Sequence, residues 1–227
     1  MKGTITGRIY TYDQYFTQLS DQSGVQVKLL RNNKLETETE TDALGNYSFE
    51  EMPFGKYNLE TSRDGFIRSW YATEVPHVGG YSPTFATSYL YEIPTYLLTL
   101  DSIGFYRAEY AFILYLKFNG DTLLPDNIYG YSFRVFAGNS PDVTCDNYVA
   151  AGKAYLRNRD MVNYQQMKPV YGVMYSYEFT NGVDPVTNDP IYLRVYPLAM
   201  GQGYGVHEYF PEALGRPSNV ISFHWDE

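Results

Sequence analysis

The side chains that most often carry catalysis are few in this chain and stand far apart. Histidine occurs at three positions: His77, His207 and His224. None of them has a second histidine at the spacing of a zinc-binding helix, and no cysteine pair accompanies them. The sequence therefore gives no reason to expect a metal site built on histidine.

The single cysteine, Cys145, lies close to two acidic residues, Asp142 and Asp146, and has no histidine nearby. Because positive charge stabilises a thiolate, these surroundings disfavour a nucleophilic thiol, and we interpret Cys145 as structural. One cysteine also excludes a disulfide within the chain. Export from the cell stays open, since many exported β domains of this size lack disulfides.

Three glutamates, Glu36, Glu38 and Glu40, alternate with threonine and would share one face of a strand at intervals of about 7 Å. Two carboxylates at that separation could work together as in a glycosidase. The alternation is more typical of a solvated strand face, whose charges also prevent edge-to-edge association of strands. We adopt the second interpretation.

Further motifs for chemistry are weak. Asp184, Asn188 and Asp189 offer oxygen ligands for Ca²⁺ in a turn, although their spacing differs from that of an EF-hand. No Gly-x-Ser-x-Gly elbow and no Gly-x-x-x-x-Gly-Lys loop occurs. We predict no catalytic residue, no metal site and no cofactor, and we place an enzyme third among the classes of function.

Tyrosine is the outlier of the composition, with 25 of 227 residues against 2 tryptophans. Its ring is apolar and its tip polar, so most tyrosines are expected on half-buried strand faces. Exposed aromatic rings also bind sugars and proteins. The candidates for ligand contact are Tyr71, at the end of a predicted strand, and Tyr81, Tyr204, Tyr209 and Phe210, which are expected in loops.

The elements that must position such residues are strands. Val25, Val27 and Leu29 alternate along one stretch and would point to the same face. A turn is predicted at 42–46, where Asp42 can bond to the backbone that follows it and Gly45 can take a positive φ. Several short alternating stretches separated by turns are typical of a β-sandwich.

Four segments carry a resemblance to a known family: Gly3-Thr4-Ile5-Thr6-Gly7, Gly24-Val25-Gln26-Val27, Thr41-Asp42-Ala43-Leu44-Gly45-Asn46-Tyr47-Ser48-Phe49 and Pro53-Phe54-Gly55-Lys56-Tyr57-Asn58-Leu59. In this order they resemble the signature of the carboxypeptidase regulatory-like domain, a transthyretin-like β-sandwich. The resemblance covers residues 1–75 and extends at most to 92. It implies a module without catalysis. In its general sequence character, although not through a shared motif, the chain also resembles modules common in Bacteroidetes cell-surface lipoproteins.

Strands are predicted in the first part at 3–12, 24–31, 35–41, 46–50, 56–63, 67–72 and 84–92. The stretch 75–83 is rich in Pro and Gly and is predicted as a loop. After a boundary at Ile93-Pro94, strands are predicted at 108–118, 130–137, 172–179, 191–198 and 219–225, with a short helix compatible with 148–166. This part resembles a fibronectin type III or immunoglobulin-like domain.

The predicted fold class is therefore all-β, with two tandem β-sandwich domains. Residues 1–92 form the transthyretin-like domain and residues 93–227 the immunoglobulin-like domain.

Charge and hydropathy limit the partners. The net charge is −9 without a basic stripe, which disfavours nucleic acid and anionic membranes. No run of 18 apolar residues could span a membrane. The first residues lead directly into a strand, and we expect that a leader with a lipid-bearing cysteine has been removed.

We accordingly predict a non-catalytic module of the cell envelope, periplasmic or on the outer-membrane surface as an exported lipoprotein, which acts in adhesion or assembly with a protein or glycan partner. The alternative is a carbohydrate-binding accessory protein of a polysaccharide-uptake system.

Overall fold

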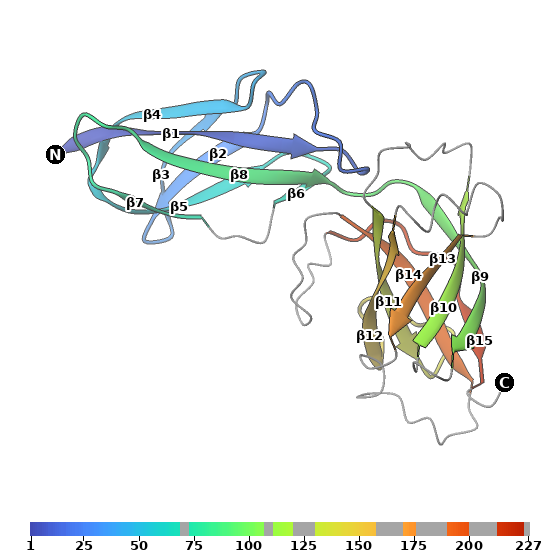
Figure 1. Cartoon of the computed structure of the whole chain (residues 1–227). Helices are drawn as coiled ribbons and strands as arrows, with labels where there is room; N and C mark the ends of the chain where they lie inside the picture. Colours follow the sequence, from blue (N-terminus) through green and yellow to red (C-terminus); the bar gives the residue numbers. More distant parts are fainter. Residues whose placement is uncertain are drawn as a thin grey trace. The chain divides into compact units, whose positions relative to one another are not determined.

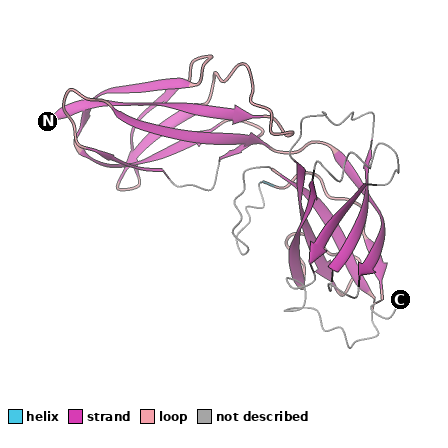
Figure 2. Cartoon of the chain, in the orientation of Figure 1, coloured by secondary structure: helices cyan, strands magenta, loops and turns pink. Residues whose placement is uncertain are grey.

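The computed structural model describes residues 1–68, 73–106, 111–119, 130–157, 170–175, 190–199 and 213–224. These residues form strands and connecting loops, with no α-helix among them, as Figure 2 shows. The all-β prediction is confirmed. The chain divides into two compact units, one containing Met1–Ile93 and the other Pro94–Ala199 and Phe210–Glu227.

Eight strands build the first unit: β1 (Lys2–Tyr12), β2 (Gln26–Arg31), β3 (Lys34–Glu40), β4 (Asn46–Pro53), β5 (Gly55–Ser62), β6 (Phe66–Arg68), β7 (Thr73–His77) and β8 (Thr84–Glu92). They form two four-stranded sheets in the orders β4-β1-β8-β6 and β3-β2-β5-β7 (Figure 1). Strands β1 and β8 are parallel, and the other neighbours in these two sheets are antiparallel.

The core of this sandwich is made by side chains at alternate positions of both sheets. Ile5 and Ile9 of β1 and Val27 and Leu29 of β2 are fully buried, and Tyr57 of β5 is 1% exposed. The predicted inward face of β2 is thus confirmed. Burying a side chain of this size stabilises the fold by about 1.5–3 kcal/mol.

A glycine is required where two sheet neighbours approach β1. The hydroxyl of Tyr47 donates a hydrogen bond of 2.7 Å to the carbonyl oxygen of Ala86. A Cβ at Gly7 would overlap that carbonyl oxygen and would lie 2.7 Å from the Tyr47 hydroxyl oxygen. Burial raises the pKa of Tyr47 far above its ordinary value, so the hydroxyl stays protonated as a donor.

The predicted turn at 42–46 forms as expected. The carboxylate of Asp42 accepts hydrogen bonds from the backbone N–H groups of Leu44, at 2.9 Å, and of Asn46, at 2.8 Å. Gly45 has a φ of 84°, in the region that disfavours side chains. Its carbonyl oxygen accepts a 2.8 Å hydrogen bond from the Ile9 N–H, which fixes the turn against β1.

The loop predicted at 75–83 is wrong for its first three residues. They belong to β7, which pairs with β5 from Gly55↔His77 to Leu59↔Thr73. Pro76 lacks an N–H donor, but β7 is at the edge of its sheet, where a strand tolerates that loss.

The last residue of β7, His77, is buried, with 3% of its surface exposed. Its Nδ1 lies 2.7 Å from Thr84 Oγ1, and its Nε2 lies 3.2 Å from the Met52 carbonyl oxygen. His77 is therefore a hydrogen-bonded core residue.

Seven strands are described in the second unit: β9 (Leu97–Tyr106), β10 (Ala111–Asn119), β11 (Gly130–Gly138), β12 (Ala150–Arg157), β13 (Val170–Tyr175), β14 (Ile191–Leu198) and β15 (Ile221–Phe223). They form one antiparallel sheet in the order β15-β14-β11-β12-β13-β10-β9, and this sheet curves around its own core (Figure 1). The strand predicted at 191–198 is confirmed as β14, and its residues Ile191, Leu193 and Val195 face the core, at most 4% exposed.

Two elements of this unit differ from the sequence prediction. Strand β9 was not predicted, and the short helix proposed within 148–166 is wrong for 150–157, which form β12. Alanine favours a helix over other residues by less than about 1 kcal/mol each. Pairing with β11 over eight positions, from Gly130↔Arg157 to Ala137↔Ala150, outweighs that local preference.

A side chain joins the two edges of the seven-stranded sheet. The amide nitrogen of Asn219, which precedes β15, donates a 2.9 Å hydrogen bond to the carbonyl oxygen of Leu100 in β9. The amide oxygen of Asn219 accepts a 2.8 Å hydrogen bond from the backbone N–H of Leu100. The side chain thus takes the place of a neighbouring strand and closes the sheet.

Candidate functional site

An aromatic surface lies on the outer face of the sheet β4-β1-β8-β6. We call it the aromatic strip and define it by Tyr10, Tyr12, Phe16, Phe85, Tyr89 and Tyr91. The parallel pairing of β1 and β8 places Tyr10 beside Tyr89 and Tyr12 beside Tyr91. Because side chains alternate along a strand, and Ile9 and Leu90 point into the core, these tyrosines point outward.

The rings of the strip stack on one another. The centroids of Tyr10 and Tyr89 are 5.5 Å apart at an interplanar angle of 18°. Those of Tyr12 and Tyr91 are 5.4 Å apart, and the Phe16 ring lies 5.0 Å from Tyr12 and 5.7 Å from Tyr91. Aromatic pairs of this kind contribute about 0.5–1.5 kcal/mol beyond the burial of their area, so the strip is a preformed surface.

A strained turn presents the Phe16 ring to the strip. Phe16 has a φ of 64°, a conformation that is rare for bulky residues. The turn is held by Asp13, whose carboxylate accepts hydrogen bonds from the N–H groups of Tyr15, at 2.9 Å, and Thr17, at 2.7 Å. Backbone strain of this kind costs about 1–3 kcal/mol and concentrates at functional sites.

The two ends of the strip differ in exposure. Tyr91 is 8% exposed because Tyr12, Phe16 and their neighbours cover it. At the other end Tyr89 is 38% and Phe85 is 75% exposed, and Phe85 has no ring contact within the described part of the chain. The open end could therefore accept a ligand.

Polar groups lie on the same outer face, on β1 and β4. The carboxylate of Glu50 accepts hydrogen bonds from the hydroxyls of Thr4, at 2.7 Å, and Ser48, at 2.8 Å, and these bonds hold the pKa of Glu50 below its usual range. The guanidinium of Arg8 lies 4.8 Å from the centroid of the Tyr10 ring, and its Nε donates to the carbonyl oxygen of Leu44 at 2.6 Å. Both charged groups are held in place.

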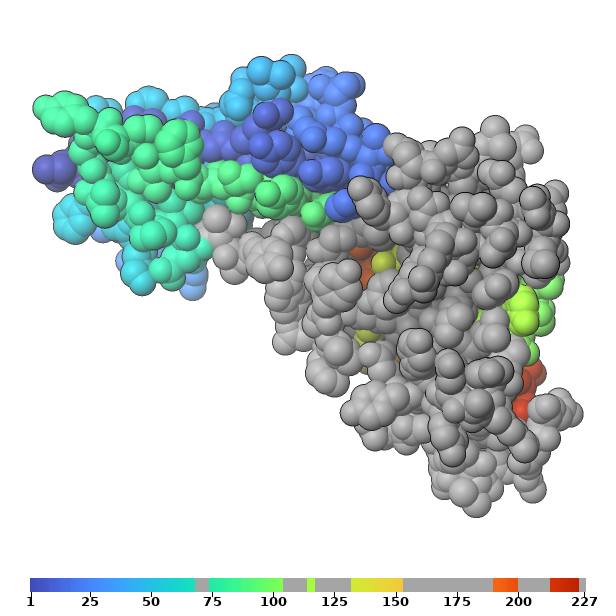
Figure 3. Space-filling view, in the orientation of Figure 1, coloured from blue at the N-terminus to red at the C-terminus, as the bar shows by residue number. Residues whose placement is uncertain are grey.

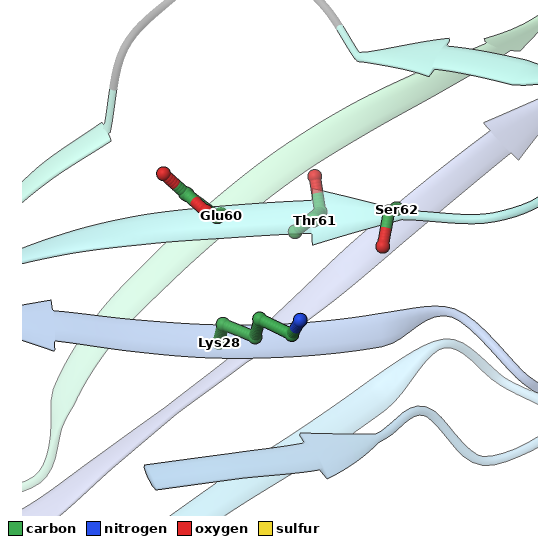
Figure 4. A pocket seen from close by; sticks show the side chains of 4 residues that line it. All are labelled: Lys28, Glu60, Thr61 and Ser62. Atoms are coloured by element: carbon green, nitrogen blue, oxygen red, sulfur yellow. The ribbon is translucent and has the colours of Figure 1, made fainter. Parts of the chain in front are cut away.

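The outer face of the other sheet, β3-β2-β5-β7, is polar. Lys28 pairs in register with Glu38 and Glu60, and its Nζ lies 3.9 Å from a Glu38 carboxylate oxygen. A shallow hollow of about 220 Å³ is lined here by Lys28, Glu60, Thr61 and Ser62 (Figure 4). Glu36, Glu38 and Glu40 are all exposed on the edge strand β3, which confirms the interpretation of a solvated face.

A second apolar surface lies at one end of the first sandwich. We call it the apolar tip and define it by Met1, Phe54, Val78 and Tyr81, which are 84%, 63%, 79% and 108% exposed. The N–H of Phe54 donates to the Met1 carbonyl oxygen at 3.2 Å, and that of Gly80 to the Lys2 carbonyl oxygen at 3.0 Å. In Figure 3 the N-terminal residues and the green segment near residue 80 are indeed at the same end.

Of the ligand-contact residues predicted from the sequence, the structure describes Tyr81, which is fully exposed in the apolar tip. Tyr71, Tyr204, Tyr209 and Phe210 lie outside the described residues, as do His207 and the three residues considered for Ca²⁺, Asp184, Asn188 and Asp189. The predicted set of ligand-contact residues therefore stays a prediction. In the described residues no group of three or more His, Cys, Asp or Glu side chains could hold a metal ion.

Sequence reasoning missed the aromatic strip, although a signal for it was present. Tyrosine occurs at alternate positions in both strands, at Tyr10 and Tyr12 and at Tyr89 and Tyr91. Each pair predicts an aromatic face on its own strand. What the sequence lacks is any local sign that these two strands are neighbours.

Comparison with known proteins supports a β-sandwich in the first part of the chain. The family model that matches is the second β-sandwich domain of the BOS complex subunit NOMO1-like proteins, over residues 2–76. No curated protein matches the chain. In the described residues no helix is long and apolar enough to cross a bilayer.

Solved structures with similar arrangements share little sequence. A DUF3823 family protein from Bacteroides uniformis is 10% identical, with a TM-score of 0.33 and 99% of each chain covered. Another, from Parabacteroides merdae, is 15% identical, with a TM-score of 0.30, 97% of this chain and 98% of that chain covered. The major pilin subunit BcpA of Bacillus cereus is 10% identical, with a TM-score of 0.37, 98% of this chain and 69% of that chain covered.

Proposed function

We propose that this protein is a non-catalytic module of the cell envelope or surface that acts in adhesion or assembly. The observation that carries the proposal is the apolar tip, where four large hydrophobic side chains are at least 63% exposed. Soluble proteins rarely expose contiguous apolar patches unless they bind a partner. The envelope location, and a lipid anchor on a removed leader, belong to this proposal and rest on the resemblance to carboxypeptidase regulatory-like domains and surface lipoproteins.

The edge strands of the two sheets in the first unit are poorly suited to pair with a strand of a partner protein. Contact with a partner through the apolar tip is therefore favoured. Edge strand β3 carries three exposed glutamates, β7 contains Pro76, β6 has 3 residues, and β4 is interrupted by a bulge at Glu51, which has a φ of 58°. Each of these features hinders pairing with a strand from another chain. A partner would therefore bind through side chains.

The test replaces three residues of the tip together, Phe54→Ser, Val78→Ser and Tyr81→Ser. Beads coated with this variant are expected to lose adhesion to bacterial cells, or the variant to lose self-association in sedimentation, because the apolar contact area is gone. The control variant carries Leu35→Ser and Leu97→Ser, which are 54% and 41% exposed elsewhere. If the tip variant adheres and sediments like the unchanged protein, adhesion through the tip is wrong.

Carbohydrate binding is the second candidate function, and the open end of the aromatic strip favours it. Exposed aromatic rings beside fixed polar groups suit the two sides of a sugar, the apolar C–H face and the hydroxyl rim. Under this function the protein would be an accessory component of polysaccharide uptake.

A further inference from the structure

We propose that the aromatic strip binds a neutral oligosaccharide, with Phe85 and Tyr89 as the rings on which sugar units stack. The inference rests on the second candidate function and assigns it a site on the outer face of β4, β1 and β8. Tyr81, the described residue among those considered from the sequence, lies in the apolar tip and is not part of this site.

The rings have the exposure and spacing that a sugar chain requires. Phe85 and Tyr89 are 75% and 38% exposed and point to the same face of β8. Four residues of an extended strand span about 13 Å, so the two rings can contact different units of one chain. The Tyr10 ring, stacked on Tyr89 at 5.5 Å, holds the Tyr89 ring in position.

The polar groups beside the rings match the hydroxyls of a sugar. The Glu50 carboxylate uses two of its roughly four acceptor sites on Thr4 and Ser48, which leaves acceptor capacity for a hydroxyl donor. The Arg8 guanidinium has further N–H donors beyond the Nε that binds the Leu44 carbonyl oxygen. Because both side chains are already ordered, binding a ligand costs little additional conformational entropy.

The charge and polarity of the face decide between possible ligands. Glu50 and Arg8 have opposite charges, and the whole chain has a net charge of −9, so a polyanionic glycan gains nothing from long-range attraction. An apolar peptide would bury the Glu50 carboxylate and the Tyr89 hydroxyl without partners, which costs free energy. A neutral oligosaccharide satisfies these groups and covers the rings at the same time.

The experiment is isothermal titration calorimetry of the full chain with hexasaccharides of β-1,4-linked glucose, β-1,3-linked glucose and β-1,4-linked mannose, and with hexagalacturonate as an acidic comparison. At least one neutral hexasaccharide is expected to bind more tightly than hexagalacturonate. Phe85→Ala and Tyr89→Ala are each expected to weaken that binding about tenfold, the equivalent of one stacking contact. Leu35→Ala, on the opposite sheet, is expected to bind like the unchanged protein.

Two further measurements make the result decisive. The Tm of each variant shows whether it folds, and chemical-shift changes of the tyrosine rings on adding sugar locate the site in the unchanged protein. The inference is overturned if no neutral hexasaccharide binds, if both ring variants bind like the unchanged protein, or if hexagalacturonate binds best. Since the tip variant with Phe54→Ser, Val78→Ser and Tyr81→Ser keeps the strip intact, loss of adhesion with retained sugar binding separates the two proposals.

Discussion

Single residues in this protein define surfaces and turns. Phe85, Tyr89 and Phe16 are ordinary aromatic residues in the sequence, and their significance comes from what surrounds them. Phe85 is open on the outer face of a sheet, and Phe16 is held in a strained conformation against Tyr12 and Tyr91. A function argued at this scale depends on exposure and orientation, which residue type alone does not give.

Acid stability is a prediction at the residue scale. Hydrogen bonds from Asn46, from its backbone N–H first and then from its side chain, lower the pKa of Asp42, and the backbone N–H of Ser23 likewise lowers the pKa of Asp21. A carboxyl whose pKa is lower in the folded state stabilises the fold above its unfolded pKa, near 3.9, and loses that contribution as the pH falls through the folded value. The free energy of unfolding should therefore fall below about pH 4.

Urea unfolding at pH 7, 5 and 3 checks this, with Asp42→Asn as the variant. The variant is expected to be less stable at pH 7 and to lose less stability than the unchanged protein between pH 5 and pH 3. An unchanged pH dependence in the variant would show that the turn at Asp42 does not contribute to acid sensitivity.

Elements in the second unit are joined by a side chain as well as by strand pairing. Replacing Asn219 with alanine removes the partners of both backbone groups of Leu100 in β9. Each buried polar group left without a partner costs about 1–3 kcal/mol, so Asn219→Ala should lower the free energy of unfolding by at least that amount. Urea denaturation measures the change.

Asn219→Asp is the matched variant for this prediction. It keeps the acceptor for the Leu100 N–H and replaces the donor to the Leu100 carbonyl oxygen with a carboxylate oxygen. Both variants should be destabilised at pH 7. If Asn219→Ala unfolds at the same urea concentration as the unchanged protein, the side chain does not close the sheet.

At the scale of the whole molecule, the division into two domains at 92/93 remains a prediction. The first unit has a core of its own, built from both of its sheets. A fragment of residues 1–93 is therefore expected to fold alone and to give a cooperative thermal transition by circular dichroism with dispersed NMR signals. A fragment without dispersed signals would mean that the rest of the chain is needed for folding.

The local features of this protein were predictable from its sequence alone. Alternation of apolar residues predicts most strands because side chains of a strand alternate between two faces, and the bounds 84–92 and 191–198 agree with β8 and β14. The turn at Asp42 and Gly45 was predictable because its hydrogen bonds and its positive φ involve residues within a few positions of each other. These features depend on neighbours in the chain.

The contacts between distant segments, in contrast, depend on the packing of the whole fold. The aromatic strip exists because β1 pairs in parallel with β8, and the closure of the second sheet depends on contact between Leu100 and Asn219, 119 residues apart. Strand β12 forms against the helix preference of its alanines because β11 supplies a partner along its whole length. Such pairings are selected by packing of the complete core, and no short stretch of sequence contains that information.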